Sequence, residues 1–521
     1  MTRLFPLLLC STLLSGCSGF YDFKIPNLVS RAENTELLEA APQDEPQRYA
    51  HAEPIAQWWE LFSDPQLGIL VEDGLRHNLE IETAIANVRE ARAQADRSFF
   101  EYFPIVTTDG GYARRRINTT TFGGAAGPGG TQTIIFDAFN ADLNARWEAN
   151  LFGRISENVE AQRAFEEATI AQLEGTYVMV AADIARNYMQ LRGAQQRLAI
   201  AERNEANQAR TYELTKALFD GGRATKFDTS RAKSQLQLTR ATIPPINTAI
   251  DIAIRRLSVL TGQLPEQLRG QFINPQPLPS LPYMVNIGNV ETLLQRRPDV
   301  YAAQQELKAN IAQYNVSITE LFPVVSVVGN IGYLASNLSE FGANALVGTI
   351  NPAFTWRLLD FGRVQAEIDA SDARAQAALA QYKQTVLTAL EDTQNALTEF
   401  SREEERRGEL EQAAASSKKA ADIANLRFEY GADDFLSVLD AERTQLQAED
   451  ALAESNIAAA VNLVNLYQNL GGGWKAVNID AVIDDDDTND DDILKNYDVT
   501  DEIVRKDASE PSELGTLLLP L

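Results

Sequence analysis

One eight-residue element occurs twice in this chain of 521 residues. Residues 147–154 read WEANLFGR, and residues 356–363 read WRLLDFGR, at an offset of 209 positions (356 minus 147). The same offset aligns three further pairs, which are Phe219 with Phe428, Gly222 with Gly431, and Ala232 with Ala441. Separated landmarks that keep one register predict an internal duplication, in which one structural unit occurs twice.

The two predicted halves share very long helices. The segment 155–218 has no proline, and its roughly 64 residues would form a helix about 96 Å long. A globular core cannot cover such a length. The corresponding segment 363–430 carries a stripe spaced 3.6 residues on average, formed by Val364, Ile368, Ser371, Ala375, Leu379, Tyr382, Val386, Leu390, Thr393, Leu397 and Phe400. This stripe predicts nearly straight helices packed side by side, whereas a conventional supercoiled dimer would favour a 3.5 repeat.

Each long helix is preceded by a predicted β-hairpin. The second hairpin spans residues 324–358, beginning with a run rich in β-branched residues, and the first spans residues 105–147. Along residues 133–147, one set of alternating positions is apolar and the other polar; the sets are Ile135, Phe139, Leu143 and Trp147 against Asp142, Asn144 and Arg146. Such alternation suits the wall of a transmembrane barrel, and a soluble two-sheet sandwich would show it as well.

Shorter helices complete the two units. Residues 66–100 and 289–321 are predicted to lead into the hairpins, and residues 227–260 and 435–470 to return from the turns at the ends of the long helices, here called the tips. Pro244 and Pro245 predict a kink or a break in the first return helix.

If the predicted strands cross a membrane, several copies of the chain must associate. After residue 17, no stretch approaches the eighteen or so apolar residues that a spanning helix requires. Four strands per chain are too few to close a barrel, and open sheet edges are not tolerated in lipid. Three chains would supply 3 × 4 = 12 strands, enough to enclose a lumen. The predicted fold is thus a mixed membrane protein with long α-helical hairpins and a trimeric 12-stranded β-barrel.

The first residues predict export and lipid attachment. Arg3 precedes an apolar run, and the tetrad Leu14-Ser15-Gly16-Cys17 matches a lipobox, which makes Cys17 the acylated first residue of the mature protein. Ser18 follows, and a residue without negative charge at that position favours sorting to the outer membrane. An ordinary secretory signal with a chance cysteine is the alternative.

Composition argues against catalysis and against nucleic acid. The mature chain would keep one cysteine of two, and the only histidines are His51 and His77, so no metal site, disulfide, cofactor site or histidine-based triad is expected. The net charge of −27 opposes binding to nucleic acid. Much of that charge lies in the last 40 or so residues, where a solvated tail is predicted and a calcium-binding tail is the alternative.

These features divide the chain into six predicted regions. They are a signal peptide (1–16), an N-terminal anchor segment (17–65), a first repeat (66–262), a linker (263–288), a second repeat with its tip near residues 428–435 (289–474), and an acidic tail predicted to be disordered (475–521).

The sequence resembles the NodT-type lipoproteins of the outer-membrane efflux protein family, which are TolC-like partners of resistance-nodulation-division pumps. Besides the two FGR elements, the matching motifs are WWELFSDPQL at 58–67, RRPD at 296–299, VLDAER at 438–443 and LGGGW at 470–474. The resemblance implies a homotrimer with a twelve-stranded barrel and a periplasmic helical tunnel. It also implies a passive exit duct that a periplasmic adaptor links to an inner-membrane pump.

The resemblance also implies site residues. The periplasmic constriction would be formed by Leu436, Asp440 and Arg443, with Asp228 of the first return helix as a tether partner. Three-fold symmetry would turn Asp440 into a ring of three carboxylates, which favours cations. The alternative is that Asp440 and Arg443 form only a solvent-exposed ion pair at spacing i, i+3 on one helix.

The turns at the tips supply candidate contacts for the adaptor. These positions are Gly221, Gly222, Arg223, Phe428 and Gly431. Any helical hairpin also needs such glycines.

Three other functions compete with the efflux duct. A structural envelope lipoprotein would form a trimeric coiled coil without paired amphipathic hairpins. An outer-membrane hydrolase would need clustered acid, base and nucleophile residues, which the sequence does not offer. A TolC-like exit duct for a type I protein or peptide secretion system would share the fold. The lipobox and the NodT-like motifs favour instead the partner of a resistance-nodulation-division pump, an exit duct for drugs or other small molecules, and they do not name the cargo.

Overall fold

The computed structural model describes residues 49–50, 52, 55–118, 133–472 and 483. The chain divides into two compact units, residues 1–476 and 477–521, and almost all of the described residues belong to the first. Cys17, His51 and the acidic tail, on which several sequence predictions rest, lie outside the described residues.

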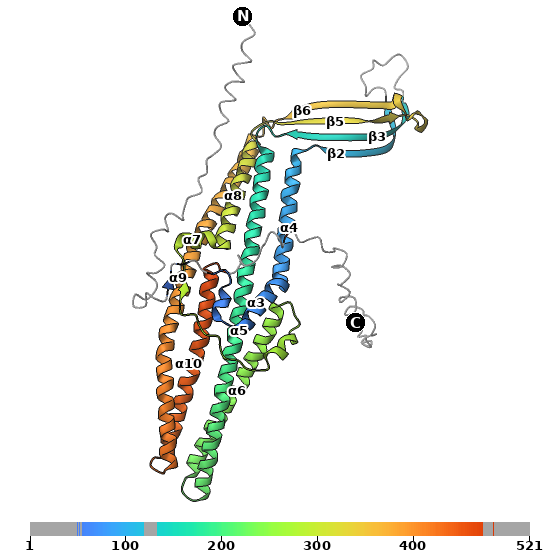
Figure 1. Cartoon of the computed structure of the whole chain (residues 1–521). Helices are drawn as coiled ribbons and strands as arrows, with labels where there is room; N and C mark the ends of the chain where they lie inside the picture. Colours follow the sequence, from blue (N-terminus) through green and yellow to red (C-terminus); the bar gives the residue numbers. More distant parts are fainter. Residues whose placement is uncertain (1–48, 51, 53–54, 119–132, 473–482, 484–521) are drawn as a thin grey trace, which may run out of the picture. The chain divides into compact units, whose positions relative to one another are not determined.

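Both halves of the first unit have the same order of main elements (Figure 1). The first half comprises β1 (Tyr49–Ala50), η2 (Trp58–Phe62), α3 (Pro65–His77), α4 (Leu79–Phe99), η3 (Phe100–Tyr102), β2 (Ile105–Asn118), β3 (Thr133–Ala149), α5 (Arg154–Asp220) and α6 (Lys226–Leu260). The second comprises η5 (Gln267–Phe272), β4 (Val285–Asn286), α7 (Val290–Arg296), α8 (Pro298–Thr319), β5 (Val324–Ala335), η6 (Leu338–Glu340), η7 (Ala343–Ala345), β6 (Leu346–Thr355), α9 (Phe361–Glu429) and α10 (Phe435–Asn469). Among the described residues, no helix has the length and apolar character needed to cross a bilayer.

The two long helices have the lengths that the sequence predicts. Helix α5 has 67 residues and α9 has 69. Nine of the eleven positions of the predicted stripe on α9 are buried, and only Leu379 and Leu390 are half-buried. Alanine recurs among the buried residues of both helices, and α9 adds buried serines, which lets neighbouring backbones approach closely along most of their length.

The shorter leading helices differ from the prediction because each is interrupted. Between α3 and α4 stands Asn78, whose Oδ1 accepts from the backbone N–H groups of Glu80 and Ile81, which caps α4. Its Nδ2 donates to the carbonyl of Leu260, at the end of α6. Between α7 and α8 stands Arg297, which has an extended backbone because Pro298 disfavours the helical conformation in the residue before it.

Helix α6 shows no break at its two prolines. It runs unbroken through Pro244 and Pro245, so a break, one of the two predicted outcomes, is wrong. The hydroxyl of Thr248 donates to the carbonyl of Pro244, and that of Thr242 donates to the carbonyl of Thr239. Such local hydrogen bonds accompany the helical backbone where the prolines contribute no N–H donor.

The main sheet is antiparallel, with strand order β2-β3-β5-β6. One face exposes large apolar side chains, among them Tyr112, Ile135, Leu143, Trp147, Ile331, Tyr333, Leu346, Ile350 and Phe354. On the other face, Asn144 Nδ2 donates to Asp109 Oδ2 over 2.6 Å, and Asn330 Nδ2 donates to Asn144 Oδ1 over 2.9 Å. The described strands form this sheet and a short β1-β4 pair, not the two packed layers of a sandwich.

Motif residues distant in sequence fasten the middle of the helical body. Trp58 is fully buried and stacks on Tyr467 of α10, with ring centroids 5.5 Å apart. Arg297, nearly buried, forms two hydrogen bonds to the carboxylate of Asp299, of 2.7 and 3.0 Å. Its Nη1 also donates to the carbonyl oxygens of Ala389 in α9 and Asn469 in α10. The motifs that carry the family resemblance therefore hold the ends of α8 and α10 against α9.

We expect Arg297→Met to lower the free energy of unfolding by about 2 kcal/mol, because two buried carbonyls would lose charged donors. Thermal unfolding followed by circular dichroism at 222 nm measures this. Arg76→Met is the control, since Arg76 forms an exposed pair with Glu72 and should change stability by less than about 0.5 kcal/mol. If the two substitutions changed stability equally, the hydrogen bonds of Arg297 would not hold α8 and α10 against α9.

Candidate functional site

Two tight turns end the long helices. Gly222 and Gly431 have positive φ angles of 71° and 70°, a conformation that glycine adopts without strain. Behind them, the backbone N–H groups of Arg223 and Ala432 donate to the carbonyls of Leu218 and Arg427 over 2.7 and 2.8 Å. The structure therefore places Gly221, Gly222 and Arg223 in one turn, and Gly431, with Phe428 just before it, in the other.

The return helices start with side-chain caps. Thr225 and Asp228 form a reciprocal capping box at the start of α6, and Asp434 Oδ1 accepts from the N–H of Ser437 at the start of α10. Asp228 Oδ2 accepts from both the backbone N–H and the hydroxyl of Thr225, over 2.9 and 2.6 Å. These hydrogen bonds lower the pKa of the Asp228 carboxyl. Within this chain, the Asp228 carboxylate therefore caps its own helix, and Asp228 is not among the residues that line the cavity beside Asp440.

A small apolar cluster joins the two hairpins just behind the tips. Ala232 of α6 packs with Phe435 and Leu439 of α10, and Tyr212 and Phe428 lie against them. The rings of Phe428 and Phe435 have their centroids 6.0 Å apart. This cluster fixes which side of α10 faces α6.

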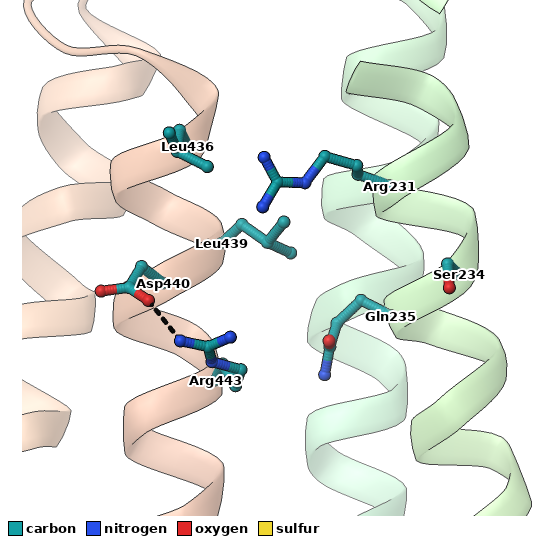
Figure 2. Close-up of a pocket in the computed structure, with 7 residues that line it drawn as sticks. All are labelled: Arg231, Ser234, Gln235, Leu436, Leu439, Asp440 and Arg443. Atoms are coloured by element: carbon teal, nitrogen blue, oxygen red, sulfur yellow. Dashed lines mark hydrogen bonds and ion pairs between the residues drawn. The ribbon is translucent and has the colours of Figure 1, made fainter. Parts of the chain in front are cut away.

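The three predicted constriction residues of α10 lie together beside this cluster. Arg443 Nη2 donates to Asp440 Oδ1 over 2.7 Å, and both side chains are mostly exposed, at 57% and 66%. Leu436 is half exposed, one turn nearer the tip. With residues of α6 they line a cavity of about 170 Å³ (Figure 2).

Three residues of α6 that the sequence reasoning missed line the opposite wall. They are Arg231, Ser234 and Gln235, and Figure 2 shows the guanidinium of Arg231 directed toward α10. Arg231 follows Asp228 by one helical turn. The predicted position of Asp228 near the constriction was therefore the one sequence signal that could have pointed to Arg231. Of the described residues around the cavity, two are arginines and one, Asp440, carries a carboxylate. The lining of this cavity therefore carries more positive than negative charge around Asp440.

Within the described ranges, no group of three or more His, Cys, Asp or Glu side chains has a geometry that could hold a metal ion. The cavity is small and partly polar, and the ion pair beside it is exposed to solvent, so this contact can be exchanged easily.

Long helical hairpins that continue from a four-stranded antiparallel sheet give this chain the fold of solved outer-membrane channels. The model of the outer membrane efflux protein family matches residues 70–263 and 289–472, and the chain belongs to this family. Nodulation protein T of Rhizobium leguminosarum bv. trifolii is 26% identical over 90% of this chain and 97% of its own length. The pyoverdine export outer membrane protein OpmQ of Pseudomonas aeruginosa is likewise 26% identical, over 90% and 97%. Among solved structures, the outer-membrane channel OprN is similar with a TM-score of 0.78 and 35% identity, over 84% of this chain and 97% of that chain.

We expect Phe435→Ala to loosen the second tip, because emptying a buried aromatic position costs about 3 kcal/mol. Trypsin cleavage after Arg427 should then become more than about tenfold faster, since 1.4 kcal/mol corresponds to a factor of ten. Phe227→Ala is the matched control, because Phe227 is 65% exposed near the other tip and Phe435 only 8%. Equal cleavage rates in both variants would show that the apolar cluster does not hold the tips together.

Proposed function

We propose that this chain is the outer-membrane channel subunit of a tripartite efflux pump and that it acts as a passive exit duct for small molecules. Its membership of the outer membrane efflux protein family carries the channel function. The strongest structural support is the direct continuation of β3 into α5, with a junction of four residues (150–153) between a sheet and a helix of 67 residues. A duct that crosses a membrane and extends beyond it needs such a continuation.

The same sheet supports a trimeric barrel. Strands β2 and β6 lie at its two edges, and each would leave a row of unpaired backbone groups in lipid. Pairing β6 of one copy with β2 of the next gives twelve strands in a homotrimer. The exposed apolar face would then contact lipid, and the polar face with Asp109, Asn144 and Asn330 would line the lumen.

Equivalent contacts at the two strand-to-helix junctions support the proposed duplication. The indole N–H of Trp147 donates to the carbonyl of Tyr102 over 2.9 Å, and that of Trp356 donates to the carbonyl of Leu321 over 3.1 Å. The family model also matches the chain in two segments, at residues 70–263 and 289–472. We assign the two repeats to residues 66–262 and 289–474.

Membership of the family supports the proposed location and partners. The helices would form a periplasmic tunnel, and a periplasmic adaptor would bind the tips at Gly221, Gly222, Arg223, Phe428 and Gly431. An inner-membrane pump of the resistance-nodulation-division class would supply the energy. The lipobox supports an additional anchor in the outer membrane through Cys17.

The constriction would lie at the tips, where three copies of Leu436, Asp440 and Arg443 meet around the axis. Arg231 faces them from α6 in each copy. Asp228, whose carboxylate is exposed enough to accept a further donor, would tether a neighbouring chain.

Single-channel conductance in planar bilayers tests the duct and its constriction. We expect the purified protein to form channels, Asp440→Ala to lower their preference for cations, and Arg443→Ala to raise conductance by freeing the braced carboxylate. Asp369→Ala removes the same charge far from the tips on α9 and should behave as wild type. A protein that forms no channels would refute the duct; channels unchanged by either tip substitution would place the constriction elsewhere.

We expect Cys17→Ala to abolish incorporation of labelled palmitate while the protein still fractionates with the outer membrane, because twelve strands hold a trimer more firmly than one lipid anchor. Cys10→Ala is the matched control and should leave labelling intact. Labelling that persists in Cys17→Ala, or loss of the protein from the outer membrane, would contradict this assignment.

A further inference from the structure

A buried carboxyl group lies directly behind the proposed constriction. Glu442 falls between Asp440 and Arg443 in sequence, yet its side chain points into the helical body and is only 8% exposed. The helical period places residues 440 and 443 on one side of α10 and residue 442 on another. One short stretch of α10 therefore carries both the constriction pair and a buried acid.

Glu442 joins α10 to α5 and lies beside α9. The hydroxyl of Thr211 in α5 donates to its Oε1 over 3.0 Å, and Asn425 of α9 borders the same cavity as the carboxyl. Its Oε2 has no hydrogen-bond partner in the part of the chain that the structure describes. The amide Nδ2 of Asn204 on α5, which is 6% exposed, also lacks one there.

These two unsatisfied groups border one polar cavity of about 260 Å³. Gln208 lies in the same wall, and its Oε1 accepts from the Thr239 hydroxyl of α6 over 2.6 Å. The cavity is thus bordered by α5, α9 and α10 and is connected to α6. All four helices that form the two tips contribute to its surroundings.

The charged groups around the cavity are already paired with one another. Arg203 of α5 pairs with Glu449 of α10 over 2.5 Å, and Lys418 pairs with Asp422 within α9 over 3.1 Å. Neither cation is paired with Glu442. Burial raises the pKa of the Glu442 carboxyl, and the polar side chains of Thr211 and Asn425 oppose this only in part.

We propose that Glu442 is a positioning residue for the constriction, and that α10 keeps its packed position against α5 only while this carboxyl is uncharged. The inference rests on the proposed function, since it deepens the account of how the tips close. When the carboxyl loses its proton, a buried charge without a counter-ion favours a hydrated arrangement in which α10 moves away from α5. Because Asp440 and Arg443 are on the same helix, their ring widens with it.

The direction of the pH dependence follows from the raised pKa. A carboxyl whose pKa is raised in the closed arrangement stabilises that arrangement most when it is protonated, so closure is strongest at acidic pH. This contribution is lost as the pH rises from the ordinary glutamate pKa through the raised value. Over that interval, the closed-to-open ratio should fall by up to about tenfold per pH unit for each titrating carboxyl.

Conductance of the full-length protein in planar bilayers between pH 5 and pH 8 tests the proposal. We expect the wild-type open fraction to rise with pH, and Glu442→Gln to remove most of this dependence and keep the channel in its low-conductance state. Thr211→Val removes a hydrogen bond that favours the charged form, so it should move the midpoint to higher pH. Glu213→Gln, at an exposed position of α5, is the matched control and should follow the wild type.

The outcomes separate the two levels of inference. Wild-type protein that forms no channels at any pH would refute the duct and this proposal together. Channels whose open fraction does not change with pH, or whose pH dependence persists in Glu442→Gln, would refute the role of Glu442 and leave the duct standing. If Glu442→Gln does not assemble, an unshifted midpoint in Thr211→Val overturns the proposal.

Discussion

The structure depends on one constraint, which is that its long helices must bury an apolar stripe along their length instead of packing around a globular core. Helices α5 and α9 are far too long to be covered by one compact core, so each must find apolar partners along its whole length. Small side chains such as Ala164, Ala168, Ala171 and Ala375 allow those partners to approach closely. Every other element is arranged around these two helices, because the strands precede them and the return helices pack against them.

Long helices that pack only side by side could slide along one another. The motif residues prevent this sliding at particular positions along the helices. Trp58 stacks on Tyr467, and Arg297 binds the last carbonyl of α10. A second fastening lies nearby, where Arg192 is fully buried between the rings of Tyr188 and Phe272, and Tyr188 donates to Asp64 over 2.6 Å. These ring contacts and hydrogen bonds join distant segments, which fixes the register of the helices.

The tips combine a small apolar cluster with polar contacts that are easily exchanged. Phe435 and Leu439 hold the hairpins together, whereas the pair between Asp440 and Arg443 is exposed to solvent and contributes little to stability. A region held in this way can open without unfolding the body above it. Glu442 would add a proton-dependent contribution at the same level of the helices.

The sequence by itself determined the helices and strands, because the spacing of apolar residues and the position of helix-breaking residues act locally. The stripe from Val364 to Phe400 is buried as its spacing predicts. The alternating sets of β3 lie on opposite faces of the sheet. Its resemblance to the family also singled out Asp440 and Arg443, which are neighbours within one helical turn. Only the tertiary structure decided the interruption at Asn78, whose amide binds Leu260, and the position of Arg231 opposite Asp440. It alone revealed that Glu442 is buried against Thr211, 231 positions away. Contacts over such separations depend on how two hairpins pack, and no local pattern in the sequence encodes that packing.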